Sequence, residues 1–362
     1  MANSLGRTYA VTAIVSSNGL GHLRRTIAVL DHVSTLVDTQ ISLVCNQSHW
    51  ERLNDTWPVA ARLAEHATVT PTTVGPLWST ESEEIARSLR SWPDNIARLT
   101  SDHPADLVIS DNLAGVLQVR PEAVLMGSFL WSSVLSNPLL LTVPEIGAFV
   151  EHERTLLANH RPPMLCVADV AMPDVLDQTT AVPLPWMCQP HNGITRNTLR
   201  EHLPVVGVAV GATAAIVEAM CPMVQRLARC RGFNLAVDPQ LAACVPEAGV
   251  LFRDIPLQDL DVVVCRPGMG TLTDCVGLRL PMITLREHGN SEMDHLTTRM
   301  EQLVGAPSFD IYSDDGDSLT TMVRDMVVPH RHAAMRTALG RLKTGGIQGA
   351  ADWLVRRLTK ST

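Results

Sequence analysis

Short apolar runs alternate with longer amphipathic segments along the whole chain. In the first half the runs of buried-strand length are YAVTAIV, ISLVC, DLVIS, AVLMG and MLCVA. A second series follows, with VVGVAVG, NLAVD, GVLF, DVVVC and MITL. Strand-length runs separated by helical segments are typical of βαβ units and parallel sheets. We therefore predict an α/β protein with two sheets.

A segment rich in proline and turn residues, TAVPLPWMCQPHNGITRNT, lies between the two series and has the composition of an interdomain linker. The length of 362 residues also favours two domains. The helical spacing of Ala351, Leu354, Val355 and Leu358 indicates a last amphipathic helix. The predicted organisation is an N-terminal domain over 1–185, a linker over 186–200, a C-terminal domain over 201–345 and a terminal helix over 346–362.

Composition narrows the class of protein. The net charge of −8, without a block of like charges, argues against binding to nucleic acid or to an anionic membrane surface. The first apolar run is too short to span a membrane and has no cleavage pattern after it. The eight cysteines form no C-x-x-C pair, and Cys45, Cys166 and Cys265 stand in apolar runs, as buried thiols do. We expect a cytoplasmic protein without membrane insertion or a zinc site.

The stretch SSNGLGHLRR follows the first predicted strand and leads into a helix. That helix is indicated by the spacing of Leu23, Ile27, Leu30 and Val33. Open α/β sheets bind ligands at this edge, and Gly19 and Gly21 allow a close backbone approach that would present His22 to a ligand. Arg24 stands where a dinucleotide-binding motif needs a third glycine, which weakens a nicotinamide or flavin interpretation. A His22 that only caps the helix or fills the turn is the alternative.

A second glycine-rich stretch, DVVVCRPGMGTLTDCVGLRLPMITL, predicts strand, turn, helix and strand. Gly268 and Gly270 leave the backbone N–H groups near Thr271 free to point at an anion, which the positive end of the helix attracts. Diphosphate is the expected ligand. Asp274, about one turn further on, is placed to accept hydrogen bonds from ribose hydroxyls. An ordinary strand-to-helix turn with a favourable acidic residue is the other interpretation.

These stretches together resemble the GT-B fold glycosyltransferases, which use nucleotide-activated sugars. CRPGMGTLTD is similar to the phosphate- and ribose-binding motif of the bacterial peptidoglycan N-acetylglucosaminyltransferase group, and GLGHLRR resembles that group's N-terminal loop. DLVISDN resembles a strand and aspartate of the natural-product glycosyltransferases. The resemblance implies two Rossmann-like domains with parallel sheets facing a central cleft, and a C-terminal helix that returns to the N-terminal domain.

On the acceptor side, the resemblance implies that His22 is the general base of an inverting reaction and that Asp111 orients it and stabilises the imidazolium. Capping of the next turn is the other interpretation of Asp111. Arg24 and Arg25 would approach the phosphates or an acidic acceptor, unless they lie on the surface. Candidates for stacking on the acceptor, unless they belong to the core, are Trp78 and Trp131.

On the donor side, the resemblance implies a diphosphate site made of Arg266, Gly268, Gly270 and Thr271, with Gly211 and Thr213 of GVAVGATAA as further candidates. Asp274 stands at a ribose-binding position that often holds Glu. The expected sugar contacts are Glu292 first and Asp294 second, although a capped helix start would explain both residues. Phe252 and Arg253 lie where the family holds the base.

We find no H-x-x-x-H or D-x-D pattern at a strand end, so we expect a metal-independent reaction without a cofactor, in which the helix end and basic residues stabilise the leaving diphosphate. The predicted activity is transfer of a hexosyl group from a nucleoside-diphosphate sugar to a hydroxyl of a soluble small molecule such as a natural-product intermediate. The resemblance favours uridine as the base, and the residues leave thymidine and guanosine open. Two alternatives stay open. One is a nucleotide-sugar hydrolase of the same fold, in which His22 activates water, and the other is a non-catalytic auxiliary homologue.

Overall fold

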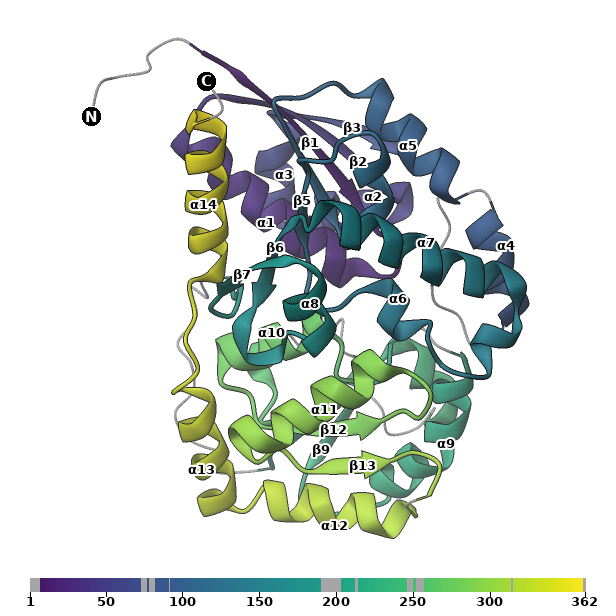
Figure 1. Cartoon of the computed structure of the whole chain (residues 1–362). Helices are drawn as coiled ribbons and strands as arrows, with labels where there is room; N and C mark the ends of the chain where they lie inside the picture. Colours follow the sequence, from purple (N-terminus) through teal and green to yellow (C-terminus); the bar gives the residue numbers. More distant parts are fainter. Residues whose placement is uncertain are drawn as a thin grey trace. The chain divides into compact units, whose positions relative to one another are not determined.

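A computed structural model describes residues 7–72, 77, 82–90, 92–189, 203–211, 214–245, 250–251, 257–313 and 315–360 (Figure 1). The chain divides into two compact units. Unit 1 comprises Met1–Met187 with Gly345–Thr362, and unit 2 comprises Cys188–Thr344. Most of the predicted linker, from residue 190 to 200, lies outside the described residues.

Unit 1 is built on a parallel sheet of seven strands in the order β3-β2-β1-β4-β5-β6-β7. The strands are β1 Tyr9–Val15, β2 Thr39–Cys45, β3 Ala67–Pro71, β4 Leu107–Asp111, β5 Val124–Met126, β6 Pro163–Val167 and β7 Thr180–Leu184. The helices are α1 Leu20–Leu36, α2 Gln47–Thr56, α3 Pro58–Ala64, α4 Ser82–Arg90, α5 Trp92–Asp102, α6 Trp131–Val134, α7 Pro144–His160, α8 Pro173–Gln178 and α14 Gly346–Lys360.

Unit 2 is likewise built on a parallel sheet, with six strands in the order β10-β9-β8-β11-β12-β13. The strands are β8 Val205–Ala209, β9 Asn234–Val237, β10 Val250–Leu251, β11 Val262–Cys265, β12 Met282–Arg286 and β13 Ser308–Asp310. The helices are α9 Ala214–Ala228, α10 Met269–Leu278, α11 Ser291–Val304, α12 Gly316–Met326 and α13 Pro329–Leu339.

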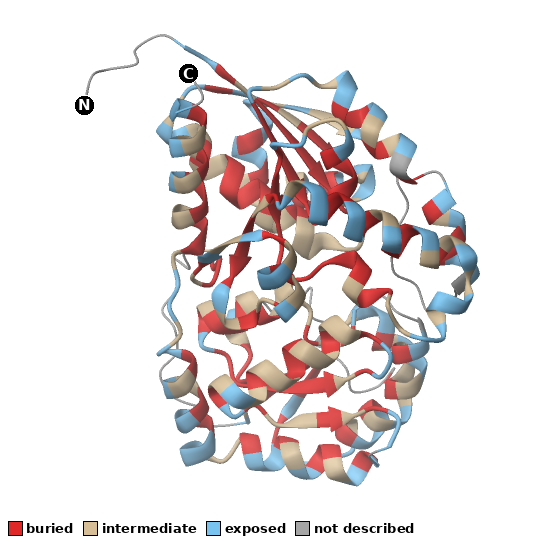
Figure 2. Ribbon diagram, in the orientation of Figure 1, coloured by how far each residue is buried: buried red, intermediate tan, exposed pale blue. Residues whose placement is uncertain are grey.

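The central strands of each sheet are buried on both faces, as Figure 2 shows. Continuous apolar runs such as those of β1 and β11 are what a parallel sheet covered by helices requires. The strands expected at these runs are all present. The segment 180–184 is a correction, because we counted it with the linker composition and it forms β7 instead. Pro183 is tolerated there since β7 is the edge strand of its sheet.

The C-terminal helix α14 belongs to unit 1, where it packs against α1 and β7. Its buried face includes Ala351, Leu354 and Leu358, as the spacing predicts, while Val355 is only partly buried. Gly346 is the first residue of the helix. It has to be glycine because a Cβ at this position would collide with the Pro185 carbonyl oxygen. This packing confirms the expected return of the terminal helix to the N-terminal domain.

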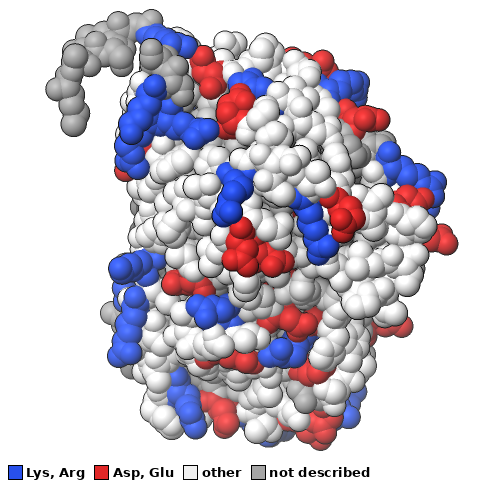
Figure 3. Space-filling view, viewed as in Figure 1, with Lys and Arg blue, Asp and Glu red and all other residues white. Residues whose placement is uncertain are grey.

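Charged side chains of both signs are mixed over the face that Figure 3 shows, with Lys and Arg gathered at the upper end of α14. Arg356, Arg357 and Lys360 line a hollow of about 400 Å³ there, together with Trp353. Within the described ranges, no helix is both long and apolar enough to cross a membrane.

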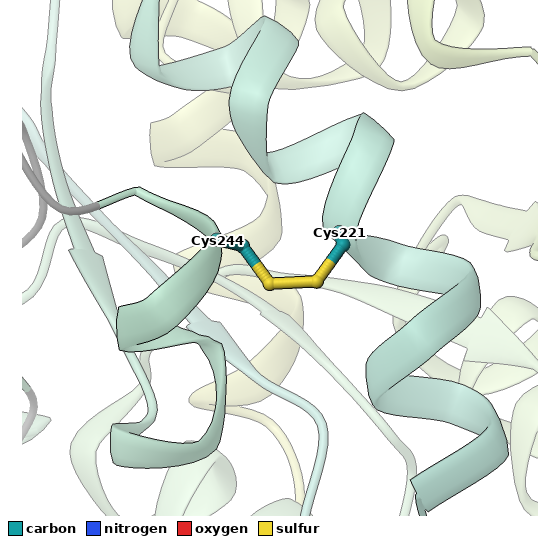
Figure 4. The surroundings of a disulfide bond; sticks show 2 residues. All are labelled: Cys221 and Cys244. Carbon is teal, nitrogen blue, oxygen red and sulfur yellow. A yellow bond between two sulfur atoms is a disulfide. The ribbon is translucent and has the colours of Figure 1, made fainter.

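A disulfide joins Cys221 of α9 to Cys244, the last residue of a 3₁₀ turn over Pro239–Cys244 (Figure 4). No prediction was made from the sequence for this pair, whose cysteines are 23 residues apart in sequence. Cys45 and Cys166 are free and buried as expected. Burial raises the pKa of Cys45 to about 12 and that of Cys166 to about 11, so both thiols stay protonated at neutral pH.

Candidate active site

Each sheet has a switch point, where consecutive connections leave a central strand in opposite directions. In unit 1 this point lies between β1 and β4, and in unit 2 between β8 and β11. Ligands of open α/β sheets bind at the carboxyl ends of the strands at such points. The pairing of Val15 with Asp111 brings the loop after β1 beside the end of β4. The two glycine-rich stretches follow β1 and β11, so each lies at the switch point of its unit.

Gly19 sets the start of α1. Its φ of 111° lies in the region that favours glycine, and the helix begins at the next residue without a side-chain cap. Gly21, by contrast, lies inside α1 and is not among the glycines with positive φ, so only Gly19 uses the conformational freedom of glycine, and the close backbone approach at Gly21 stays a prediction. The interpretation of His22 as a helix cap also fails, since His22 is the third residue of α1.

His22 and Asp111 are in direct contact. His22 Nδ1 lies 2.7 Å from Asp111 Oδ1, and the Asp111 side chain is completely buried while that of His22 is 15% exposed. An ionised carboxylate only accepts hydrogen bonds, so Nδ1 carries a proton, and in the uncharged imidazole Nε2 then keeps its lone pair. In the part of the chain that the structure describes, Nε2 has no hydrogen-bond partner. An imidazole held in this way can accept a proton from a substrate hydroxyl.

Arg25 is not on the surface but contacts the same carboxylate. Its Nη2 donates to Oδ1 at 2.8 Å and to Oδ2 at 2.9 Å of Asp111, and its side chain is 11% exposed. Thr26 Oγ1 lies 3.1 Å from Oδ2. Arg24 instead places its guanidinium 5.7 Å from the ring centre of Trp57. This role of Arg25 was not predicted, although its spacing of three residues from His22 puts both side chains on one helix face.

The charge of Asp111 is maintained by these neighbours. Burial by itself would raise its pKa, but the positive charge of Arg25, then that of His22 when it is protonated, and the hydrogen bonds from both hold the pKa below the ordinary value. The following turn is capped by Ser110, whose Oγ lies 3.2 Å from Leu113 N, and not by Asp111. Capping therefore does not account for Asp111.

Aromatic rings border His22 on another side. The Trp131 ring is stacked at 6.5 Å between ring centres, and the Phe129 ring meets the imidazole edge-on at 6.1 Å. Trp131 is only 1% exposed, so it belongs to the core and has no free face for stacking on an acceptor. Trp78 lies outside the described residues.

In unit 2 the predicted phosphate loop leads into α10. Gly268 is the N-cap residue and Gly270 and Thr271 lie in the first turn, where we find no acidic residue and no side-chain cap among the described residues. The first N–H groups of such a helix have no partner within the helix. Gly268 has a φ of −65° and open space around a hypothetical Cβ, so neither its backbone angles nor its neighbours require glycine. This helix end can hold an anion.

Arg266 and Asp274 flank this helix start. Arg266 Nε donates to Glu287 Oε2 at 2.7 Å, a carboxylate that is 6% exposed. Glu287 therefore offsets much of the charge of Arg266 and fixes its position. Asp274 is 8% exposed and lies near Cys188, whose pKa is raised to about 12 by burial and then by the charge of Asp274.

The end of β8 is stabilised by Asp238, a residue that sequence reasoning missed. Its Oδ2 accepts from Val210 N at 2.8 Å and from Gly211 N at 3.1 Å. Gly211 has a φ of 72°, which explains the glycine. Arg266 N also donates to Ala209 O at 2.9 Å, so the loops after β8 and β11 are neighbours. Outside the described residues lie Thr213, Phe252 and Arg253.

Glu292 and Asp294 lie in the first turn of α11. Asn290 caps this helix by accepting from Glu292 N at 3.1 Å and from Met293 N at 3.2 Å. Asp294 lies 3.6 Å from the Arg286 guanidinium. Burial raises its pKa, and Arg286 opposes that effect. The capped helix start is present, while sugar contacts of the two carboxylates stay a prediction. Among the described residues, His, Cys, Asp and Glu do not gather in a group of three or more that could hold a metal ion.

No protein-family model matches the chain, and no curated protein is similar to it in sequence. Solved structures do match. The glycotransferase of kitacinnamycin is 15% identical with a TM-score of 0.65 over 98% of this chain and 100% of its own. UDP-glucose:anthocyanidin 3-O-glucosyltransferase in complex with UDP is 12% identical, with a TM-score of 0.66 over 98% and 99%.

The spinosyn rhamnosyltransferase SpnG complexed with thymidine diphosphate is 15% identical, with a TM-score of 0.61 over 98% of this chain and 100% of its own. At such identities the likeness concerns the fold. It extends over both units and agrees with the two parallel sheets and the returning helix. The chain has the GT-B fold of these glycosyltransferases.

Proposed function

We propose that the protein is an inverting glycosyltransferase that moves a sugar from a nucleoside-diphosphate sugar to a hydroxyl of a small molecule. The observation that carries this proposal is the contact of His22 with the buried Asp111 at the switch point of unit 1. The likeness to structures of UDP- and TDP-binding glycosyltransferases supports it.

In the proposed reaction His22 Nε2 takes the proton of the acceptor hydroxyl, and the oxygen forms a bond to the anomeric carbon. The bond from that carbon to the diphosphate oxygen breaks, with inversion, and the diphosphate leaves. Asp111 stabilises the imidazolium that forms. Unit 2 would hold the donor, with the first N–H groups of α10 and the loop at Gly211 around the diphosphate.

Donor details are part of the proposal. Asp274 is assigned to the ribose, and Glu292 with Asp294 to the sugar. Uridine is the first candidate base, and thymidine is the second. A soluble acceptor, a cytoplasmic location and a reaction without a metal ion are likewise proposed, and the metal-free reaction relies on the end of α10.

Calorimetric titration with UDP, dTDP and GDP tests the donor assignment. We expect one diphosphate to bind much more tightly than the other two. The matching sugar nucleotide, incubated alone, should release little free sugar by mass spectrometry. Rapid release would favour the hydrolase in which His22 activates water, and binding of none of the three would favour a non-catalytic auxiliary protein.

A further inference from the structure

Asp111 is contacted by three side chains of α1, those of His22, Arg25 and Thr26. Oδ1 accepts from Arg25 Nη2 at 2.8 Å and lies 2.7 Å from His22 Nδ1, while Oδ2 accepts a second bond from Arg25 at 2.9 Å. We infer that Arg25 is a positioning residue which, by neutralising Asp111, keeps His22 unprotonated and able to act as a base near neutral pH. This inference rests on the proposed function of His22.

The geometry points to Asp111 as the reason for the placement of Arg25. A buried charge is costly unless it is paired, and the Asp111 side chain is completely buried. Arg25 Nε is itself buried without a hydrogen-bond partner among the described residues. The guanidinium therefore leaves its Nε donor without a hydrogen bond and makes two hydrogen bonds to the Asp111 carboxylate. Both bonds come from the one Nη2 atom, which therefore holds the positive charge of Arg25 against both oxygens of the carboxylate, including the Oδ1 that meets His22.

Charge balance gives the functional consequence. Arg25 with ionised Asp111 is a neutral pair, beside which an uncharged imidazole is stable. Without Arg25, a buried negative charge would stand next to His22 and would attract a proton to the Asp111–His22 pair. A protonated imidazole cannot accept the acceptor's proton, so the base would be blocked at a pH where the native enzyme works.

The other groups around His22 do not replace Arg25. His49 of α2 interacts electrostatically with His22, and the pKa of His49 is lowered by burial, then by the charges of Arg52 and His22. The side of Trp131 and Phe129 contributes uncharged rings. Behind them Glu153 of α7 accepts from Ser132 N, and burial raises its pKa to about 7. Among the described residues, Arg25 is the one cation bonded to Asp111.

The test follows protonation of His22 directly in the free protein, by NMR of ¹⁵N-histidine-labelled samples, with the signal assigned by its loss in His22→Gln. In Arg25→Gln we expect the pH midpoint of this signal to rise by about one unit or more, a tenfold change in proton affinity. Arg25→Lys should keep the midpoint near that of the native protein. Arg62→Gln is the matched control. Arg62 of α3 forms an exposed ion pair with Asp31, which belongs to α1 like Arg25, so this variant also removes an Arg–Asp pair at that helix. An unchanged midpoint in Arg25→Gln overturns the inference.

A second variant covers the case in which Arg25→Gln does not fold. The double variant Asp111→Asn/Arg25→Gln contains neither buried charge, so it replaces one neutral pair by another. We expect its His22 midpoint to stay close to that of the native protein. A midpoint lower than the native one by about one unit or more would show that Arg25 does not neutralise Asp111 in the native protein, and would overturn the inference.

Turnover gives the enzymatic readout. The acid limb of the pH profile of kcat/KM should move to higher pH in Arg25→Gln by the same amount as the NMR midpoint, with activity recovering at alkaline pH. A uniform loss at every pH would mean that Arg25 is only structural. If the native protein transfers no sugar, the proposed function fails, and the NMR midpoints still decide the role of Arg25.

Discussion

Substitutions of His22 and of Asp111 should have different effects on turnover and on stability. Replacing His22 by Ala removes the proposed base but leaves unit 2 intact, so we expect turnover to fall by about 100-fold or more with the dissociation constant of the diphosphate unchanged. Initial rates and calorimetry measure the two quantities. His32→Ala, on the same helix, serves as the control. Native turnover in His22→Ala would remove His22 from the mechanism.

Asp111→Asn should affect stability as well as turnover. It leaves Arg25 without its counter-charge, which costs about 3–5 kcal/mol for a buried pair. The native pKa of Asp111 is lowered, so its contribution is present above the unfolded value of about 4 and is lost as the pH falls through the lower native value. Urea unfolding should therefore show a large gap between the two proteins near neutral pH that narrows in acid. A constant gap would contradict the assignment.

The contact of His22 with Asp111 was implied by the family resemblance, and its physical basis is that the loop after β1 and the last residue of β4 meet at one edge of the sheet. The sequence did not predict that Arg25 completes the contact. The signal was present, since residues three apart on a helix share a face, but a second arginine at a helix start is more often solvated. The burial of Trp131 depends on the packing of α6, which no local pattern encodes.

At the scale of elements, a substitution at the start of α10 should change nucleotide binding with little effect on stability. Gly268 has backbone angles that any residue adopts and open space for a Cβ, so Gly268→Ala should change the free energy of unfolding by less than about 1 kcal/mol. A methyl group beside the first N–H groups of α10 should still weaken UDP binding by about tenfold or more, because the diphosphate can no longer approach the backbone closely. Calorimetry and urea unfolding measure these effects.

Gly305→Ala provides the opposite control. Gly305 ends α11 with a φ of 69°, so the substitution should cost about 1 kcal/mol of stability while UDP binding stays unchanged. If Gly268→Ala behaves like Gly305→Ala, the start of α10 is not an anion site.

Helices α6 and α7 are linked through a buried acid. Glu153 accepts from Ser132 N, and burial raises its pKa from 4.5 to about 7. The unfolded chain ionises at lower pH than the native one, so stability falls as the pH rises from about 4.5 to about 7, by roughly 3 kcal/mol. Glu153→Gln keeps an acceptor and removes this loss, so its unfolding free energy should exceed the native value near pH 8, unlike that of the exposed Glu151→Gln. Parallel pH profiles of the native protein and Glu153→Gln would contradict this.

The strands show which elements local pattern can identify. The central ones, buried on both faces, carry continuous apolar runs and are recognisable at once. Three edge strands were missed, β3, β7 and β13. Each is only partly buried, and β7 also contains Pro183, so their sequences resemble loops. Their place in the sheet comes from the neighbouring strand.

At the scale of the whole molecule, contacts between segments far apart in the chain could not be predicted from the sequence pattern. Cys221 and Cys244 are 23 residues apart and belong to a helix and a 3₁₀ turn, and spacing alone does not reveal such a connection. The return of α14 to unit 1 was predicted through family resemblance. Its physical basis, the packing on α1 and the absence of room beside Gly346, could not be read from the helix's own pattern.

The division into two units makes a final prediction possible, because a ligand that binds one unit stabilises that unit. UDP at about 100 times its dissociation constant adds about 2.7 kcal/mol to the stability of the unit that binds it. Hydrogen exchange should therefore slow in peptides that contain residues 205–211 and 262–272 of unit 2. Peptides over residues 20–36 of unit 1 should exchange at the same rate with and without UDP. Protection confined to unit 1 would contradict the donor assignment, and a nucleotide that protects both units would show that binding couples them.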